Sequence, residues 1–460
     1  MFFWVLSEIA VVAGFVFAAA AIAHMVRQRR SPQSALAWLL VMVLLPYVGV
    51  PLYLILGGRK MRRIAITKGP LQLQRDGDPL TPREAARVQR ILATYDLPSV
   101  TVGNRVDLCR TGEESYQALV TLIDEARDSL FITMFILQKD DVGREIRDHL
   151  TRRAAEGVDV RLLLDDWGSF RTRRQFLTPL LEAGGQVAYF MPLLHRPFAA
   201  RTNLRNHRKI VIADEQLVLS GGINIGQEYL GPTPRRGRWT DLAFVLEGPA
   251  TRFYRDVFMS DWAFARGVEP ADPSEDPRAA PSDAVVQVVP SGPDVPGDAL
   301  YEVVLSTTFA AEARLWIVTP YFVPDDALLQ GLTLAARRGV DVRIIMPERS
   351  NHRITDWARG GYLREIQEAG GAVLLYTGGM LHAKVLVMDE QLAMVGSANM
   401  DMRSLFLNYE VGMLMYSPGE IDAVARWVEN VAAPARQGVP PVGVIRDFGE
   451  SVVRMVAPLL

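Results

Sequence analysis

Two long apolar stretches lie near the N-terminus of this chain. Residues 2–26 are apolar except for three positions, and residues 35–57 carry no charge at all. Each stretch is long enough to cross about 30 Å of hydrocarbon. The pattern therefore predicts an N-terminal membrane anchor of two apolar segments, spanning residues 1–63.

A cleaved signal peptide is the alternative for the first stretch, because Ala21-Ile22-Ala23 resembles a cleavage site. A retained anchor is favoured, since no positive charge precedes the apolar run, three arginines follow it and a second apolar run comes next. Pro46 and Pro51 interrupt that second run, and basic clusters flank both of its ends. It is therefore predicted to be either a kinked span or a re-entrant hairpin.

Beyond about residue 100 the chain repeats one pattern. A helix end, a glycine turn and a buried strand read as AAEGVDVRLLLDD at 154–166 and again as AARRGVDVRIIMPE at 335–348. The next matching pair is AGGQVAYF at 183–190 and AGGAVLLY at 369–376. Helical patterns alternate with short apolar runs in both copies, which predicts α/β units with a mostly parallel, buried sheet in each.

Self-similarity at this length indicates duplicated domains rather than a solenoid. We expect a first α/β domain at 100–265, a linker at 266–284 that is rich in Pro and Asp, and a second α/β domain at 285–460. The two copies should form a pseudo-twofold pair. The tail, residues 444–460, is amphipathic at helical spacing, which favours packing onto the core over a membrane contact.

The overall composition limits the range of functions. A net charge of −2 gives no global attraction to nucleic acid, so any anionic substrate has to be held by local charge. The single cysteine, Cys109, cannot form an internal disulfide. Lysine and histidine are scarce, with five and six residues in the whole chain.

Those scarce residues recur in one register. The stretch NHRKIVIADEQLVLSGGIN occupies 206–224, and LHAKVLVMDEQLAMVGSAN occupies 381–399. Each places a His and a Lys two positions apart, an Asp five positions later and a glycine-rich turn that ends in Asn, at a constant offset of 175 residues. The candidate catalytic residues are therefore His207, Lys209, Asp214, His382, Lys384 and Asp389.

The chemistry of these side chains suits a phosphodiester. In a strand, His207 and Lys209 share one face, while Asp214 lies on the other, so a structural role on the far side of the sheet is favoured for Asp214 and, equally, Asp389. A Lys ammonium and an Asn amide bind phosphate oxygens, and an imidazole attacks phosphorus or transfers a proton. The candidate phosphate-binding residues are Asn224, Ser397 and Asn399.

Two further carboxylates occupy matched positions in the repeat. Asp241 in RWTDLAFVLEG and Glu410 in LNYEVGMLMY each begin the strand that follows an Asn turn. We expect them to orient the two imidazoles. No metal is expected in the chemical step, because the remaining histidines are isolated and show no ligand spacing.

The pattern H-x-K-x(4)-D-x(6)-G-[GS]-x-N, present twice, resembles the phospholipase D superfamily. The surrounding stretches NLRNHRKIVIAD, GGINIGQEY, LHAKVLVMD and GSANMDMRSLFLNYE are similar to bacterial cardiolipin synthases of that superfamily. This resemblance covers nearly the full length. It implies two phospholipase D-like domains, no cofactor, and phosphatidyl transfer between two phosphatidylglycerol molecules that yields cardiolipin and glycerol through a phosphatidyl-histidine.

By the same resemblance, His207 is the expected nucleophile and His382 the expected acid and base, although the symmetry of the motifs does not choose between them. The expected partners are phosphatidylglycerol, cardiolipin and the bilayer, with no nucleic acid. The expected location is the bacterial inner membrane, with the catalytic domains on the cytoplasmic side.

Three other functions fit parts of the pattern. A hydrolytic phospholipase D would use the same residues with water as acceptor. A membrane-tethered nuclease is disfavoured by the charge balance and by the lack of a long basic tract with interleaved aromatic residues. A catalytically dead scaffold is the least favoured, because binding alone does not need two complete His, Lys and Asn sets.

Overall fold

The computed structural model describes residues 68–73, 83–172, 174–191, 204–272 and 282–456, together with short stretches and single positions between 19 and 53. Among the described residues before the repeated part of the chain lie the helices α2 (Pro32–Leu44) and α5 (Arg83–Ala93).

The first half runs from β1 to α9. Its elements are β1 (Thr101–Cys109), α6 (Gly112–Glu125), β2 (Ser129–Met134), α7 (Asp141–Ala155), β3 (Asp159–Asp165), α8 (Arg174–Glu182), β4 (Gln186–Phe190), β5 (Ile210–Ala213), β6 (Leu217–Gly221), β7 (Ala243–Glu247) and α9 (Thr251–Arg266).

The second half repeats this order with small additions. Its elements are β8 (Ala284–Ser291), α10 (Ala299–Ala310), β9 (Arg314–Val318), β10 (Phe322–Val323), α11 (Asp326–Arg337), β11 (Asp341–Pro347), α12 (Arg353–Glu368), β12 (Ala372–Tyr376), β13 (Val385–Met388), β14 (Leu392–Gly396), β15 (Met400–Asp401), α13 (Met402–Phe406), β16 (Glu410–Met415), α14 (Pro418–Ala432), β17 (Arg436–Gln437) and α15 (Val444–Val456).

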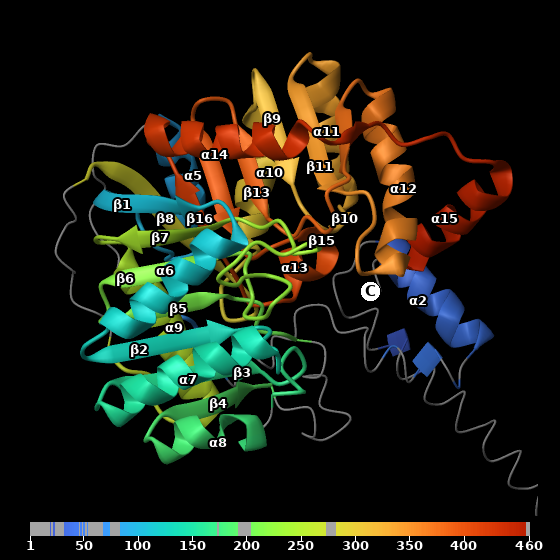
Figure 1. Ribbon diagram of the computed structural model, residues 1–460. Helices are drawn as coiled ribbons and strands as arrows, with labels where there is room; N and C mark the ends of the chain where they lie inside the picture. Colours follow the sequence, from blue (N-terminus) through green and yellow to red (C-terminus); the bar gives the residue numbers. More distant parts are fainter. Residues whose placement is uncertain are drawn as a thin grey trace, which may run out of the picture.

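One continuous sheet joins the two halves (Figure 1). The first half contributes the strand order β1-β7-β6-β5-β2-β3-β4, and the second contributes β8-β16-β14-β13-β9-β11-β12, with the short β17 added beside β12. The two series meet where β1 pairs antiparallel with β8. The matched strand order confirms the duplicated α/β architecture that the repeats predict.

The prediction of a mostly parallel sheet is wrong. Among the described strands of the large sheet, β2 with β3 and β3 with β4 pair in parallel in the first half, and β9 with β11 and β11 with β12 do so in the second. A separate two-stranded sheet of β10 and β15 is also parallel. A helix connects β2 to β3 and β3 to β4, which permits parallel pairing, whereas the motif strands β5 and β13 turn directly into β6 and β14. Such short turns join antiparallel strands.

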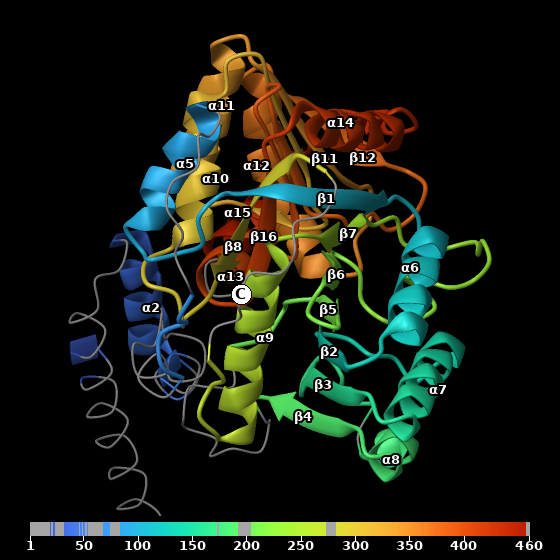
Figure 2. The ribbon, with the colours of Figure 1, turned by 90° about the vertical axis from the view of Figure 1, so that its left-hand side faces the viewer.

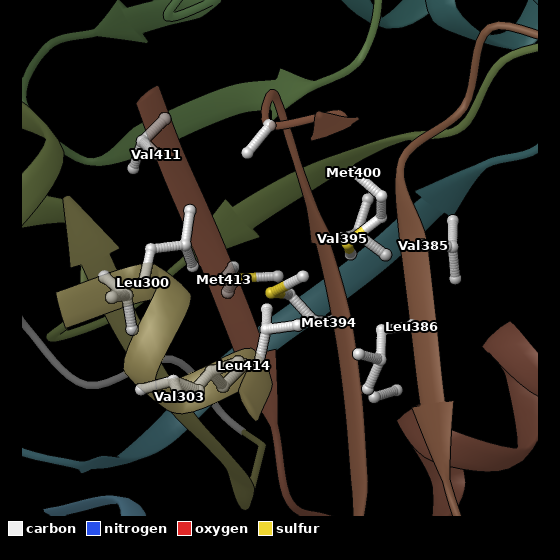
Figure 3. Close-up of a cluster of buried hydrophobic side chains, with 14 of the residues drawn as sticks. Leu300, Val303, Val385, Leu386, Met394, Val395, Met400, Val411, Met413 and Leu414 are labelled. Carbon is white, nitrogen blue, oxygen red and sulfur yellow. The ribbon is translucent and has the colours of Figure 1, made fainter. Parts of the chain in front are cut away.

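Helices cover both faces of the sheet (Figure 2). α6, α7 and α8 pack on one face of the first half, while α9 packs on β2, β4, β5 and β6 and reaches β8 of the second half. α14 does the reverse, since it packs on β12, β13 and β14 and reaches β1. The core between the helices and the sheet is apolar. In the second half, Leu300 and Val303 of α10 pack with Met394, Met413 and Leu414 of the sheet (Figure 3).

Most residues of the two predicted membrane segments lie outside the described part of the chain. Among the described residues, no helix is both long and apolar enough to cross a bilayer. The rings of Trp38 and Tyr53 are nevertheless 5.3 Å apart, whereas a continuous helix would separate them by about 22 Å. The chain therefore folds back on itself between Trp38 and Tyr53.

Candidate active site

Two segments from different halves hold His207 by its backbone. The N–H of His207 donates to the carbonyl of Tyr409 (2.9 Å), and the N–H of Tyr409 donates to the carbonyl of Arg205 (2.9 Å). This bridge lies just before β5 and just before β16. It fixes the first motif against the strand that carries Glu410.

The second motif is held in the same way by the first half. The N–H of His382 donates to the carbonyl of Thr240 (2.7 Å), and the N–H of Thr240 donates to the carbonyl of Met380 (2.8 Å). In both cases the residue that follows the bridging carbonyl is a carboxylate, Asp241 or Glu410. One dipeptide thus positions both the backbone and the ring of each histidine.

Each imidazole is bound by a carboxylate from the opposite half. Both oxygens of Glu410 lie 3.0 Å from Nδ1 of His207, and Oδ2 of Asp241 lies 2.7 Å from Nδ1 of His382. With the Nδ1 proton directed at a carboxylate, Nε2 is the nitrogen left for chemistry. Asp241 and Glu410 thus lie where an orienting role requires, and their partners cross the interface between the halves.

The two lysines lie beside the histidines of their own motifs. The ammonium of Lys209 donates to the carbonyl of His207 (2.6 Å), and that of Lys384 donates to the carbonyl of His382 and lies 3.1 Å from its Nε2. Both lysines are buried. Burial lowers the pKa of Lys209 to about 7 and that of Lys384 to about 8, although nearby carboxylates oppose the change.

Burial also holds both imidazoles neutral at pH 7. It lowers the pKa of His207 to about 4 and that of His382 to about 3, and in each case the carboxylate partner opposes the change only in part. Lys384 of the second motif lowers the pKa of His207, and Lys209 of the first lowers that of His382. Because each motif acts on the histidine of the other, the two motifs form one electrostatic site.

The carboxylates remain ionised despite their burial. Burial by itself would raise the pKa of Asp241, but Lys384 and His382 outweigh it and hold that pKa below its ordinary value. The pKa of Glu410 is lowered in the same way, where His207, Lys209 and the Ser397 hydroxyl outweigh burial. The site therefore balances two buried anions against two buried lysines.

The asparagine turns contribute amides to the site's surroundings. Oδ1 of Asn224 accepts from the N–H of Ile136 (3.2 Å), and the Asn224 side chain also bonds the Tyr229 hydroxyl. Nδ2 of Asn399 donates to the Ser404 hydroxyl (3.2 Å), while its buried Oδ1 has no partner among the described residues. The unpaired Oδ1 can accept from a ligand hydroxyl, and the second N–H of Nδ2 can donate to a phosphate oxygen.

Ser397 has a different setting from the one that the sequence predicts. Its hydroxyl is fully buried, donates to Oε2 of Glu410 and accepts from the N–H of Val411 (3.0 Å). The hydroxyl thus contacts Glu410 in this structure, and direct phosphate binding by Ser397 stays a prediction. The equivalent Gly222 has no room for a side chain, because an added Cβ would lie 2.1 Å from Oδ1 of Asp241.

The motif aspartates lie outside the cluster of His and Lys residues. The carboxylate of Asp214 accepts from the N–H groups of residues 127–129, and that of Asp389 accepts from those of residues 312–314. Both aspartates have positive φ, at 52° and 48°, in the turn that ends a motif strand. They tie that turn to the start of β2 or β9, the structural role that face alternation favours.

Aromatic rings make the two histidines unequal, which the sequence did not indicate. Phe135 packs edge-on against His207 at 4.8 Å between centroids. His382 instead contacts Trp239 at 5.3 Å and Tyr229 at 5.6 Å, and those two rings also contact each other. The repeat could not reveal this difference, because it emphasises what the halves share.

A buried charge cluster underlies the first motif. Arg208 points away from the site, binds both oxygens of Asp261 (2.8 Å) and donates to the carbonyl of Glu410 (3.1 Å). Lys68 binds Asp261 and also Asp294 (2.6 Å), so two cations and two anions share the cluster. Strand alternation predicts the direction of Arg208, but only the fold brings Lys68 there.

Comparisons with known proteins agree with this geometry. The domain family described as "Cardiolipin synthase, PLD-like domain" matches residues 119–262 and 305–432, and the family described as "Phospholipase_D-nuclease N-terminal" matches residues 16–58. Among solved structures, the phosphatidylserine synthase of Haemophilus influenzae has a similar fold, with a TM-score of 0.63 at 16% identity, and the match covers 82% of this chain and 100% of that chain. The fold is that of a duplicated phospholipase D-like protein.

The chain belongs to the cardiolipin synthase family of phospholipase D-like proteins. It is 33% identical to cardiolipin synthase 1 of Bacillus anthracis, with 94% of this chain and 90% of that protein covered. It is 34% identical to the major cardiolipin synthase of Bacillus subtilis, with 85% of each chain covered.

Proposed function

We propose that this protein is a cardiolipin synthase, which transfers a phosphatidyl group from one phosphatidylglycerol to a hydroxyl of a second and releases glycerol. The similarity to cardiolipin synthases over most of the chain supports this reaction. The observation that carries it is the pair of buried imidazoles, each bound at Nδ1 by a carboxylate of the opposite half.

In the first step Nε2 of His207 attacks the phosphorus of the donor lipid, and the bond from phosphorus to the glycerol oxygen breaks. A neutral ring is required, and burial keeps the pKa of His207 near 4. His382 donates a proton to the departing glycerol oxygen. The negative charge of the bound phosphodiester favours the protonated form of His382 at that stage.

In the second step a hydroxyl of the acceptor phosphatidylglycerol gives its proton to His382 and attacks phosphorus. The phosphorus–nitrogen bond breaks, cardiolipin forms and His207 returns to its neutral state. Lys209, Lys384, Asn224 and Asn399 would bind the phosphate oxygens as negative charge develops on them. The site residues themselves suffice for these proton and phosphoryl transfers, so the proposal includes no cofactor.

We further propose the division of the chain into an anchor at 1–63, domains at 100–265 and 285–460, and a linker at 266–284. The anchor would hold the protein in the bacterial inner membrane, with the catalytic domains on the cytoplasmic side. The return of the chain between Trp38 and Tyr53 favours a hairpin over a straight second span.

The test is incubation of the purified protein with labelled phosphatidylglycerol in detergent micelles and in liposomes, followed by identification of the lipids formed. Cardiolipin and glycerol in equal amounts are the expected products. Phosphatidic acid without cardiolipin would show a hydrolase instead. The His207→Ala protein serves as the control for contaminating activity.

A further inference from the structure

The last helix, α15, docks onto the protein by its charged face. Glu450 is buried and pairs with Arg364 of α12 (2.8 Å), and Asp447 pairs with the same guanidinium (2.8 Å). The Arg454 guanidinium stacks 4.1 Å from the ring centre of Tyr362. The polar side of an amphipathic helix has therefore been turned inward.

The apolar side of α15 faces outward as a consequence. Val444, Ile445, Phe448 and Val452 are 87%, 90%, 70% and 40% exposed. The prediction that this amphipathic tail packs its apolar stripe onto the core is therefore wrong. Large contiguous apolar surfaces of this kind mark interaction sites.

The start of α12 extends the same surface. Ile354 is 58% exposed and Trp357 is 49% exposed. Gly449 brings the two helices together, because a Cβ at that position would lie 3.2 Å from the Trp357 ring. We name the combined surface the outer apolar face, and its members are Ile354, Trp357, Val444, Ile445, Phe448 and Val452.

The surroundings of the outer apolar face indicate what covers it. Three exposed arginines are close to these residues in the chain, Arg349 and Arg353 just before Ile354, and Arg446 on α15, whose guanidinium also pairs with Glu450. An apolar helix face with a Trp and flanking arginines is the composition of helices that lie in the interface of an anionic bilayer. Under the proposed function both the substrate and the product are anionic bilayer lipids.

A second apolar surface lies on the same side of the molecule. α2 exposes Leu36, Leu40, Val43 and Leu44 by 50% or more, and Figure 1 shows α2 and α15 together at the right-hand edge. α2 belongs to the stretch that the sequence predicts to be a membrane anchor. A bilayer that contacts α2 from this side would thus also contact the outer apolar face.

We propose that the outer apolar face is a membrane-contact surface, which inserts into the headgroup region of an anionic phospholipid bilayer and holds the second half against it. The choice of an anionic lipid rests on the proposed function. The exposure of the apolar side of α15 is an observation that does not depend on that function. The contact would be separate from the predicted anchor and would lie at the opposite end of the chain.

Site-specific labelling of the full chain tests the contact without any need for turnover. Cys109 is buried and burial raises its pKa to about 12, so a thiol-reactive fluorophore should label Phe448→Cys selectively, with the unmutated chain as the blank. In phosphatidylglycerol nanodiscs, lipids that carry a nitroxide on the acyl chain should quench this label at least about twofold. A label at Arg426→Cys, an exposed position on α14, should remain unquenched.

Equal quenching of the two labels, or none at position 448, would overturn the proposal. Excimer emission from pyrene at Phe448→Cys would show that a second copy of the chain covers the face, and this result too would overturn it. Nanodiscs of phosphatidylcholine separate apolar insertion from the attraction of the arginines to anionic headgroups. Weaker quenching in these nanodiscs is expected if the arginines bind anionic headgroups.

The double variant Ile445→Asp/Phe448→Asp gives an independent readout. Cardiolipin formation should fall roughly five-fold or more in liposomes and change less than about twofold in detergent micelles, where no planar surface is needed. Val268→Asp, at another exposed apolar position, is the matched control. Equal activity of the double variant and the control in liposomes would contradict the proposal, whereas a lack of cardiolipin in every micelle assay would instead defeat the proposed function.

Discussion

Oδ2 of Asp241 lies 2.7 Å from Nδ1 of His382, although the two residues belong to different halves and are 141 positions apart in sequence. Glu410 and His207 repeat the relationship in the opposite direction, across 203 positions. Each motif histidine therefore takes its carboxylate partner from the other half. The docking of β1 on β8 joins the sheets that bring the pairs together.

This crossed arrangement predicts different defects for the two carboxylates. Glu410→Gln should impair the nucleophile and prevent formation of the phosphatidyl-enzyme, while Asp241→Asn should impair proton transfer and still permit the adduct with an activated leaving group. Each should lower kcat by roughly 10²–10⁴-fold. Steady-state kinetics together with mass spectrometry of acid-quenched protein would measure both effects. Asp422→Asn, an exposed acid-to-amide change, should leave both unaffected.

The histidines themselves should divide the reaction in the same way. His207→Ala should abolish both turnover and the covalent adduct, because in the proposed roles His207 bonds phosphorus and His382 only transfers protons. His382→Ala should lose turnover with phosphatidylglycerol but still accumulate adduct from a p-nitrophenyl phosphatidyl ester, whose leaving group needs no proton. An adduct found on His382 in the His207→Ala protein would reverse the assignment.

The buried lysines predict a pH dependence of substrate binding. Burial lowers the pKa of Lys209 to about 7 and that of Lys384 to about 8, so each is charged below its pKa and neutral above it. The KM for phosphatidylglycerol should therefore rise as the pH increases from about 7 to about 9, with a smaller change in kcat. Micelle assays across this range would measure the effect. A constant KM would show that the bound phosphate keeps both lysines charged or does not contact them.

The motif aspartates should affect stability rather than chemistry. Asp389→Asn weakens charge-assisted bonds to three N–H groups at the start of β9, and the free energy of unfolding should fall by roughly 1–3 kcal/mol. Asp214→Asn should behave alike at the start of β2. Denaturant unfolding in detergent gives the stability, and kcat per folded molecule should stay within about twofold. A large loss of kcat in a variant that remains stable would show that Asp214 or Asp389 has a catalytic role.

Chelation tests the expectation of metal-free chemistry, which rests on the lack of ligand spacing among the histidines of the sequence. EDTA should leave cardiolipin formation unchanged in micelles made with metal-depleted buffer. Complete loss of activity that one divalent ion restores would contradict the expectation. Micelles are preferred because divalent ions also change how anionic bilayers pack.

The sequence by itself determined the features that depend on local periodicity and repetition. The two-residue period of a strand places His207 and Lys209 on one side and Arg208 on the other, because successive side chains alternate. The constant offset of 175 residues established the duplication, and the matched positions of Asp241 and Glu410 identified them as candidate orienting carboxylates. None of these inferences requires knowledge of which strands are neighbours.

Only the tertiary structure decided which groups meet. The partner of each carboxylate depends on how the halves dock. The hydroxyl of Ser397 binds Glu410 because Ser397 directly follows β14 and Glu410 begins β16, the neighbouring strand. Strand direction follows from the connections, which is why the sheet is mixed. α15 turns its charged face inward because Arg364 and Tyr362 of α12 bind residues of that face. An amphipathic pattern shows that a helix has two different faces, but the neighbouring elements determine which face is buried.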